Sequence, residues 1–343
     1  MKIRKTKKEA VMASCPTAMC HASTLLPNPD GSLLCAWFGG SKEGAPDVQI
    51  WLSRRTADVW SEPRCITAEP VAHWNPVLFS LQDGHILLFY KTGQEIRRWQ
   101  TQCLESTDGG TSWSAPRELV PGDFGGRGPV RNKPIRLKSG AILAPASQED
   151  GIWRAFIDRS ADEGRSWQQS AAVYLAGVTG SRTERTVAPA DSSIPVSEQS
   201  FYGRGVIQPT LWESTPGKVH MLLRSTEGCI CRSDSADDGF SWSAARRTEM
   251  PNNNSGIDLD RSASGRLFLV CNPIAKNWGE RSPITLFTSS DNGQSWQELQ
   301  VLDQGAGEFS YPSIRCVGQT LFISYTARRT NICCWQIDFS ETD

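Results

Sequence analysis

Short apolar runs follow small polar turns at six places along the chain. The six segments are Asp30-Gly31 to Trp37, Asp83-Gly84 to Tyr90, Ser139-Gly140 to Pro145, Gly217 to Leu223, Ser264-Gly265 to Val270 and Gly318 to Tyr325. An apolar run of this length beside a turn signal predicts a β-strand that follows a hairpin turn. Because such segments are spread over the whole chain, we expect an all-β protein with almost no helix.

A second pattern is an octapeptide with Ser, Asp, Gly and Trp at offsets 0, 2, 4 and 7. It occurs as Ser106–Trp113, Ser160–Trp167, Ser235–Trp242 and Ser289–Trp296. The Asp can accept hydrogen bonds from nearby backbone amides and the Gly supplies a positive φ, so the octapeptide predicts a hairpin turn whose Trp packs on its own strands. A fifth, decayed copy runs from Ser53 to Trp60, with Arg55 and Ala57 in place of Asp and Gly.

The spacing of these copies predicts the architecture. They start at positions 53, 106, 160, 235 and 289, so the gaps are 53, 54, 75 and 54 residues. A nearly fixed period indicates stacked copies of one supersecondary unit. With about four short strands per unit, six units predict a six-bladed β-propeller. The repeat covers nearly all of residues 1–343, so we expect one domain, closed by a last strand near residues 331–339 that pairs with the N-terminus.

One gap is 21 residues too long, and the extra residues lie within 176–203, where Thr, Ser, Arg, Pro and Gly dominate. We expect a long surface loop between blades three and four. Two alternatives stay open for it: a lid over the central axis, or a loop without a functional role.

Charge and cysteine content narrow the function classes. The chain has 36 basic and 37 acidic residues, which argues against a nucleic-acid or membrane-surface partner. No apolar run reaches the length of a signal peptide or membrane span. The 11 cysteines are scattered and lack zinc spacing, so reduced thiols in a cytoplasmic protein are favoured. We expect no metal, no cofactor and no obligate protein partner.

A polar motif precedes each of the six apolar runs, where the innermost strand of a blade would begin. The motifs are His21-Ala22-Ser23, Trp74-Asn75-Pro76, Asn132-Lys133-Pro134, Gln208-Pro209, Asn254-Ser255-Gly256 and Ser310-Tyr311-Pro312. Polar groups at equivalent positions of all blades converge on one axis, which favours a small-ligand site there. The alternative is that they only satisfy backbone groups of the inner strands.

Together, the octapeptides, which correspond to Asp-boxes, and the inner-strand motifs resemble the bacterial sialidase-like proteins with BNR repeats. The resemblance covers almost the whole chain. It implies a sialidase-like glycoside hydrolase that removes a terminal acidic sugar, sialic acid or a related one, from a glycoconjugate. Such repeats specify the fold more strongly than the reaction, because they also occur in propellers that are not glycosidases.

The resemblance also implies roles for individual residues. Glu43, with Asp47 nearby, lies where the family has its acid/base; Arg224 and Arg281 lie where it has two arginines that bind the substrate carboxylate; and Tyr311 lies where it has the nucleophilic tyrosine. The remaining polar side chains expected to bind substrate are Asn75, Lys133 and Asn254.

Two positions depart from the family pattern. The first-blade arginine aligns with His21, and the glutamate that activates the tyrosine aligns with Gln208. A neutral amide cannot take the phenol proton, and an ordinary Tyr has a pKa of about 10. With an ordinary pKa of about 6.5, His21 would titrate near neutral pH and serve as the base or as a neutral hydrogen-bond donor.

Three functions remain open at this point. The first is hydrolysis of an acidic glycoside. The second is a polysaccharide lyase that breaks uronic-acid linkages by β-elimination, with His21 and Tyr311 as base and acid. The third is a non-catalytic carbohydrate-binding propeller, which would have no need of Glu43 as an acid.

Overall fold

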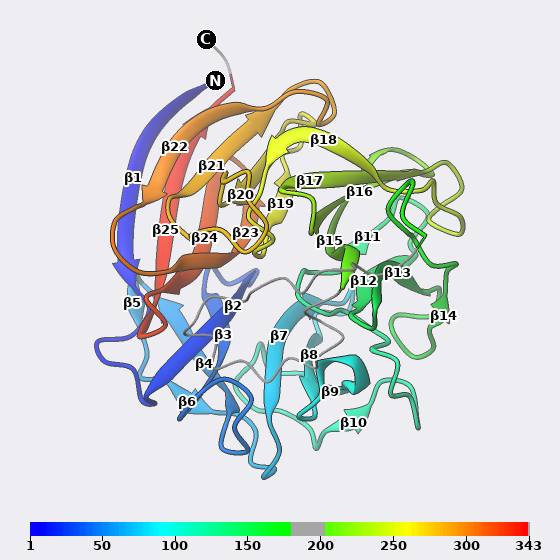
Figure 1. The fold of residues 1–343 in the computed structure, drawn as a ribbon. Coiled ribbons are helices and arrows are strands. Elements are labelled where there is room, and N and C mark those ends of the chain that lie inside the picture. The colour runs from blue at the N-terminus through cyan, green and yellow to red at the C-terminus, as the bar shows by residue number, and fades with distance from the viewer. Residues whose placement is uncertain (180–202, 342–343) are drawn as a thin grey trace.

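The computed structural model describes residues 1–179 and 203–341. Most of this part is β-strand, and its one helical element is the 3₁₀ turn η1 (Ile96–Arg98). The strands form sheets arranged around a common centre, as Figure 1 shows, so the all-β propeller prediction is confirmed. No helix in these two ranges has the length and apolar character needed to cross a membrane.

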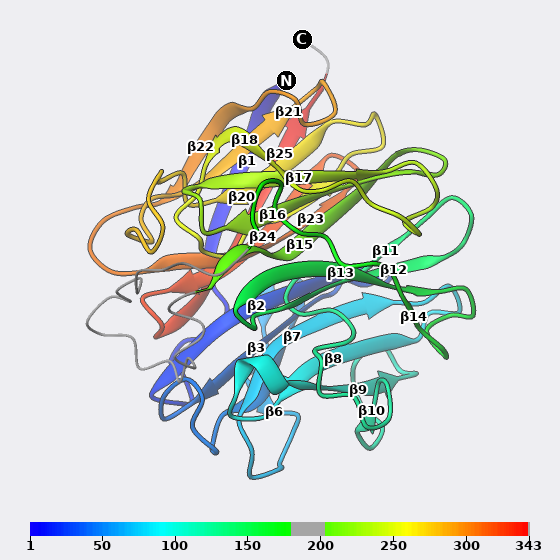
Figure 2. The same cartoon turned by 45° about the vertical axis from the view of Figure 1, so that its right-hand side comes forward.

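One sheet joins the two ends of the chain. Its strand order is β1-β25-β24-β23. The strands are β1 (Lys2–Ala10), β23 (Phe309–Val317), β24 (Thr320–Ala327) and β25 (Asn331–Ser340). Because β1 pairs antiparallel with β25 along its whole length, the predicted closure of the ring is confirmed, and the two strands lie side by side in Figures 1 and 2.

The next two sheets follow the chain order. The first contains β2 (Met19–Pro27), β3 (Leu33–Gly40), β4 (Gln49–Thr56), β5 (Val59–Trp60) and β6 (Arg64–Cys65). The second contains β7 (His73–Ser80), β8 (Ile86–Thr92), β9 (Gln100–Ser106) and β10 (Arg117–Glu118). In each sheet the first strand is the innermost, and β2 contacts both β7 and β23.

The following strands form one sheet of eight and one of four. The larger contains β11 (Ile135–Arg136), β12 (Ile142–Gln148), β13 (Ile152–Ser160), β14 (Gln168–Gln169), β15 (Arg204–Thr215), β16 (Lys218–Ser225), β17 (Cys229–Ser235) and β18 (Arg246–Pro251). The smaller contains β19 (Asp258–Arg261), β20 (Leu267–Cys271), β21 (Ile284–Ser289) and β22 (Gln297–Asp303). Its inner strand β19 contacts β15 and β23.

The prediction of six separate blades needs a correction. The strands of residues 1–179 and 203–341 form five hydrogen-bonded sheets, not six. The reason is a short parallel pairing between β13 and β15, of Ile152 with Arg204 and Trp153 with Gly205, which merges two antiparallel four-stranded units into one sheet. Most of the predicted loop 176–203 lies outside the described residues.

The octapeptide turns are built from local hydrogen bonds. In Ser106–Trp113 the Gly110 amide donates to Ser106 Oγ at 2.8 Å, and the Ser112 amide donates to an Asp108 carboxylate oxygen at 2.8 Å. Gly110 has a φ of 89°, and a Cβ there would lie 2.6 Å from the Leu34 side chain of the preceding sheet. Glycine is therefore required for backbone conformation and for close packing between sheets.

The decayed copy forms a different turn. Thr56 pairs with Val59 across a two-residue hairpin, and the two residues between them, Ala57 and Asp58, have φ values of 47° and 66°. Two consecutive positive φ values are the mark of the tight turn that suits the twist of a hairpin. The copy that lacks Asp and Gly therefore forms a shorter turn between its two strands than the complete octapeptides do.

Candidate functional site at the centre of the propeller

Five of the six inner-strand motifs share an unusual backbone conformation. One non-glycine residue in each has a positive φ; these are Ala22 (54°), Asn75 (45°), Gln208 (51°), Asn254 (60°) and Tyr311 (55°). The pairing register also shifts at this point in β2, β7, β15 and β23. Such bulges re-aim a side chain, and positive φ at non-glycine residues clusters at functional sites.

The side chains near these bulges form one group of buried and half-buried residues, which we call the axial cluster. Its members are His21, Glu43, Arg131, Gln208, Arg224, Asn254, Arg281, Glu308, Tyr311 and Arg329. They come from the first sheet, both halves of the eight-stranded sheet, the β19–β22 sheet and the closing sheet. The innermost strands that carry several of them surround the centre in Figure 1.

Arg224 links the polar groups of the cluster. Its Nε donates to Asn254 Oδ1 at 3.0 Å, and its Nη1 donates to Gln208 Oε1 at 3.1 Å and to the Tyr311 hydroxyl oxygen at 2.9 Å. The side chain is only 3 % exposed. All three acceptors are uncharged, and no carboxylate of a described residue pairs with Arg224. A buried guanidinium without a counter-ion is costly, so it suits an anionic ligand.

Tyr311 is surrounded by arginines. The guanidinium carbons of Arg131, Arg224 and Arg281 lie 5.5, 5.8 and 5.3 Å from its ring centroid. Arg131 also donates to the Tyr311 and Pro312 carbonyl oxygens at 2.6 and 2.8 Å, which holds the bulge in place. Burial lowers the pKa of Arg131 to about 10, a value that still leaves it charged at neutral pH.

A network of ion pairs lies beside the tyrosine. Glu308 pairs with Arg281 at 2.7 Å and with Arg329 at 2.8 Å, and Arg329 also pairs with Glu43. The pKa of Glu308 is well below its ordinary value: burial opposes ionisation, but the charges of Arg281 and Arg329 outweigh it. Glu43 is therefore brought to the cluster as the partner of Arg329.

His21 does not behave as the sequence predicted. Its ring lies 4.3 Å from that of Tyr311, between centroids, but it is buried and neither nitrogen has a hydrogen-bond partner among the described residues. Burial, together with Arg329, Arg281 and Arg131, lowers its pKa well below 6.5, although Glu308 acts in the opposite direction. The expectation that His21 titrates near neutral pH is wrong; the imidazole is neutral.

Three predicted residues make no hydrogen bond or ion pair with the axial cluster in the described part of the chain. Lys133 donates to both Asp258 carboxylate oxygens, at 3.0 and 2.8 Å, so its charge is already paired inside the fold. Asp47 accepts hydrogen bonds from Ser41 in an exposed loop. Asn75 is buried at the bulge of β7 but makes no side-chain hydrogen bond to another described residue.

Sequence reasoning missed several charged members of the cluster. Arg131 directly precedes the motif Asn132-Lys133-Pro134, and Glu308 lies three residues before Tyr311, so their proximity to inner-strand motifs was an available signal. Arg329 lies in the β24–β25 hairpin and has no sequence signal. A further carboxyl group, Glu149, follows β12; burial raises its pKa while Arg224 acts to lower it.

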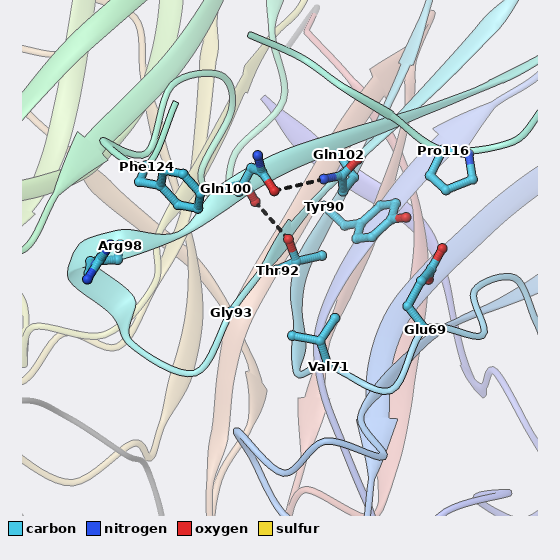
Figure 3. A pocket seen from close by; sticks show the side chains of 10 residues that line it. All are labelled: Glu69, Val71, Tyr90, Thr92, Gly93, Arg98, Gln100, Gln102, Pro116 and Phe124. Carbon is cyan, nitrogen blue, oxygen red and sulfur yellow. Dashed lines mark hydrogen bonds between the residues drawn. The ribbon is translucent and has the colours of Figure 1, made fainter. Parts of the chain in front are cut away.

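A separate pocket of about 420 Å³ lies along β8 and β9, shown in Figure 3. The Tyr90 hydroxyl is buried there without a hydrogen-bond partner among the described residues, and burial raises its pKa. The pocket shares no residue with the axial cluster. Across residues 1–179 and 203–341, no three His, Cys, Asp or Glu side chains are placed to hold a metal ion.

Comparisons with known structures identify the same fold. A protein of unknown function from Dyadobacter fermentans aligns with a TM-score of 0.75 at 16 % identity, over 98 % of this chain and 99 % of that one. The Hadza microbial sialidase Hz136 has a TM-score of 0.75 at 16 % identity, over 97 % and 68 %. The NanB sialidase from Streptococcus pneumoniae has a TM-score of 0.70 at 11 % identity, over 98 % and 70 %.

At these identities the structural similarity shows a sialidase-like fold and no more. No curated protein matches the chain by sequence. The family model described as a BNR repeat-like domain matches residues 31–323, which is most of the chain. The chain therefore belongs to the BNR repeat-like domain family.

Proposed function

We propose that the protein is a glycoside hydrolase that removes a terminal acidic sugar from a glycoconjugate. The observation that carries this proposal is Arg224, a buried guanidinium whose acceptors in the described ranges are all neutral. Its Nη2 donates to no described residue, so two N–H groups remain for a ligand carboxylate. Four guanidinium groups and two ion-paired carboxylates in the axial cluster leave an excess of positive charge, which also favours an anion.

Tyr311 is the group proposed to face the anomeric carbon. Its hydroxyl oxygen accepts a hydrogen bond from Arg224, which leaves the hydroxyl proton free to be donated. Gln208 gives its amide oxygen to Arg224 and takes no proton from the phenol. Tyr311 then either attacks the anomeric carbon, as in the tyrosine variants among glycosidases, or stabilises an oxocarbenium ion.

The sugar is proposed to differ from sialic acid. A neutral, buried His21 replaces a positively charged residue of the sialidase pattern, so one carboxylate ligand is lost. Gln208 removes the negative charge beside Tyr311. Both changes affect side chains near Tyr311, whereas Arg224, Arg281 and Tyr311 are kept, which is the pattern expected when a site adapts to a different acidic sugar.

We propose that the two halves of the eight-stranded sheet, β11–β14 and β15–β18, are two separate blades of the propeller. Hydrophobic clusters support this: residues of β12 and β13 pack against residues of β15 and β16, as other clusters pack between neighbouring sheets. Counted in this way, six blades place their inner strands around the axis.

The test is a panel of glycosides with wild-type protein and Tyr311→Phe. We expect cleavage of an acidic glycoside other than a sialoside, such as a uronide, and no cleavage of the neutral glycoside that lacks only the carboxylate. Removal of the Tyr311 hydroxyl should lower kcat by roughly 10²–10⁴-fold, in the range of a lost proton-transfer group. Binding of the acidic sugars without cleavage would instead support a carbohydrate-binding propeller.

A uronate lyase is the second candidate. The observation that favours it is the neutral imidazole of His21 beside Tyr311, since an unprotonated nitrogen can accept a proton. β-Elimination would produce an unsaturated uronate, which absorbs in the ultraviolet, whereas hydrolysis would not. Appearance of that absorbance with polyuronates would replace the hydrolase proposal with this one.

A further inference from the structure

Glu149 lies in the hairpin that follows β12. The role that we assign to it rests on the proposed glycosidase function. We propose that Glu149 is the acid that protonates the glycosidic oxygen, the role that the family resemblance gives to Glu43. The two residues occupy comparable positions: Glu43 follows β3, the second strand of its sheet, and Glu149 follows β12, the second strand of its half of the eight-stranded sheet.

The end of β12 brings Glu149 close to the bulge at Gln208. The Ser147 hydroxyl oxygen, two residues earlier, accepts a hydrogen bond from the backbone N–H of Gln208 at 3.1 Å, so this end of β12 packs against β15. β12 ends at Gln148, and Glu149 is the next residue, at the end of the strand that packs against β15. Gln208 and Tyr311 are both bonded to Arg224 Nη1, and Arg224 is also the charged group that acts on the Glu149 carboxyl, so Glu149 lies near the Arg224–Tyr311 pair.

The two carboxyl groups differ in their partners. Glu43 is paired with Arg329, so protonation of Glu43 would remove the charge that Arg329 needs in this partly buried ion pair. Glu149 forms no ion pair or hydrogen bond with another residue of the described ranges. Burial raises its pKa, and Arg224 is the charged group that opposes this change. The other cations near the hairpin are engaged elsewhere: Arg154 donates to Gln148 and Arg204 pairs with Glu227.

These properties fit a general acid. A carboxyl group that keeps its proton to a higher pH than usual can donate it to a leaving group near neutrality. Glu149 donates its proton to the glycosidic oxygen as the bond from that oxygen to the anomeric carbon breaks, and the bond's electron pair stays on the leaving oxygen. Water then bonds to the anomeric carbon and gives its proton to the Glu149 carboxylate, which restores the acid.

The experiment compares Glu149→Gln with Glu43→Gln and with Asp150→Asn, the exposed neighbour in the same hairpin, as the matched control. Each is assayed on an alkyl and a nitrophenyl glycoside of the sugar that wild-type protein cleaves. Glu149→Gln should lower kcat/KM roughly 10²–10⁴-fold on the alkyl glycoside and far less on the nitrophenyl glycoside, which needs no protonation. It should also remove the alkaline limb of the pH profile, while Asp150→Asn behaves as wild type.

Equal losses on both glycosides, or a leaving-group-dependent loss in Glu43→Gln instead, would overturn the assignment. A second measurement does not depend on turnover. In protein labelled with ¹³C at the glutamate carboxyl carbon, the resonance missing from Glu149→Gln should titrate above the ordinary value of about 4.3. If that resonance titrates at or below the ordinary value, Glu149 is not the acid. If the pKa of Glu149 is raised but the protein cleaves no glycoside, only the proposed function is refuted.

Discussion

The octapeptide turns and the axial cluster lie at opposite ends of the same strands but are built in opposite ways. In the half-sheet β15–β18, Val219 pairs with Ser235, the first residue of an octapeptide, at one end of β16, whereas Arg224 pairs with Ile207 at the other end. The hydrogen bonds of the turn at Ser106 span four residues or fewer. In the axial cluster, Arg224 and Tyr311 are 87 positions apart and Arg329 and Glu43 are 286 apart.

This difference separates stability from function. A turn whose hydrogen bonds join residues close in sequence can form on every blade, whether or not a ligand binds. The axial cluster holds buried charge and positive φ values, both of which cost free energy and are tolerated where a site needs them. We therefore expect changes at the turns to affect folding and changes at the axis to affect ligand binding.

The largest expected effect is that of Arg224→Met. Loss of a charge-assisted hydrogen bond should weaken the binding of an acidic sugar by about 1.5–3 kcal/mol, or roughly 10- to 100-fold, while neutral sugars bind as before. Isothermal titration calorimetry with both sugars measures this. Arg97→Gln, which changes an exposed arginine paired with Glu95, is the control. Equal affinity of Arg224→Met and wild type for the acidic sugar would show that the axial cluster does not bind the ligand through Arg224.

Trp242→Ala should act in the opposite way. Trp242 is half-buried and its Nε1 donates to the Gly239 carbonyl at 2.9 Å, so we expect a loss of roughly 1–3 kcal/mol in the free energy of unfolding, less than for a fully buried Trp. Trp242→Phe keeps most of the packing and should lose less. Denaturant titration gives these values, and turnover per folded molecule should not change. A specific loss of turnover would place this turn in the site.

His21 should make stability depend on mild acid. Its folded pKa lies well below 6.5, so the unfolded state binds more protons once the pH falls below about 6.5, and stability declines from that point down to the folded pKa. A tenfold difference in proton affinity between the two states corresponds to about 1.4 kcal/mol of stability. His21→Gln should flatten the decline between pH 7 and 5.5 in urea titrations; His73, whose pKa burial also lowers, leaves a residual slope. An unchanged slope would mean that His21 is not held neutral.

The turns should respond only to stronger acid, with the smallest effect. Hydrogen bonds from the Ser166 side chain and backbone lower the pKa of Asp162 to about 2. This carboxylate therefore stabilises the fold above the ordinary Asp value of about 3.9 and loses that contribution as the pH falls toward 2. Asp162→Asn should reduce the pH dependence of unfolding only below pH 4. A change near pH 6 would contradict the separation of the two regions.

Much of the fold could be predicted because its determinants are local. The apolar runs, the octapeptides and their period depend on residues within one hairpin, and the resulting all-β propeller and the closure of β1 on β25 agree with the structure. The pairing of Ile152 with Arg204 was not predictable, since it joins two strands across a long gap in the sequence. That pairing is why the count of separate sheets is five.

Within the candidate site, the sequence by itself determined which motifs begin the inner strands, and this was enough to name Tyr311, Gln208 and Asn254, whereas Arg224 was named through the family resemblance. Only the tertiary structure decided how charge is shared among them. It pairs Lys133 with Asp258 and Glu43 with Arg329, and it gives Arg224 no carboxylate partner among residues 1–179 and 203–341. The physical reason is that burial and the placement of counter-ions, which set the pKa of His21 and Glu149, arise from contacts between blades and leave no mark on the sequence around each residue.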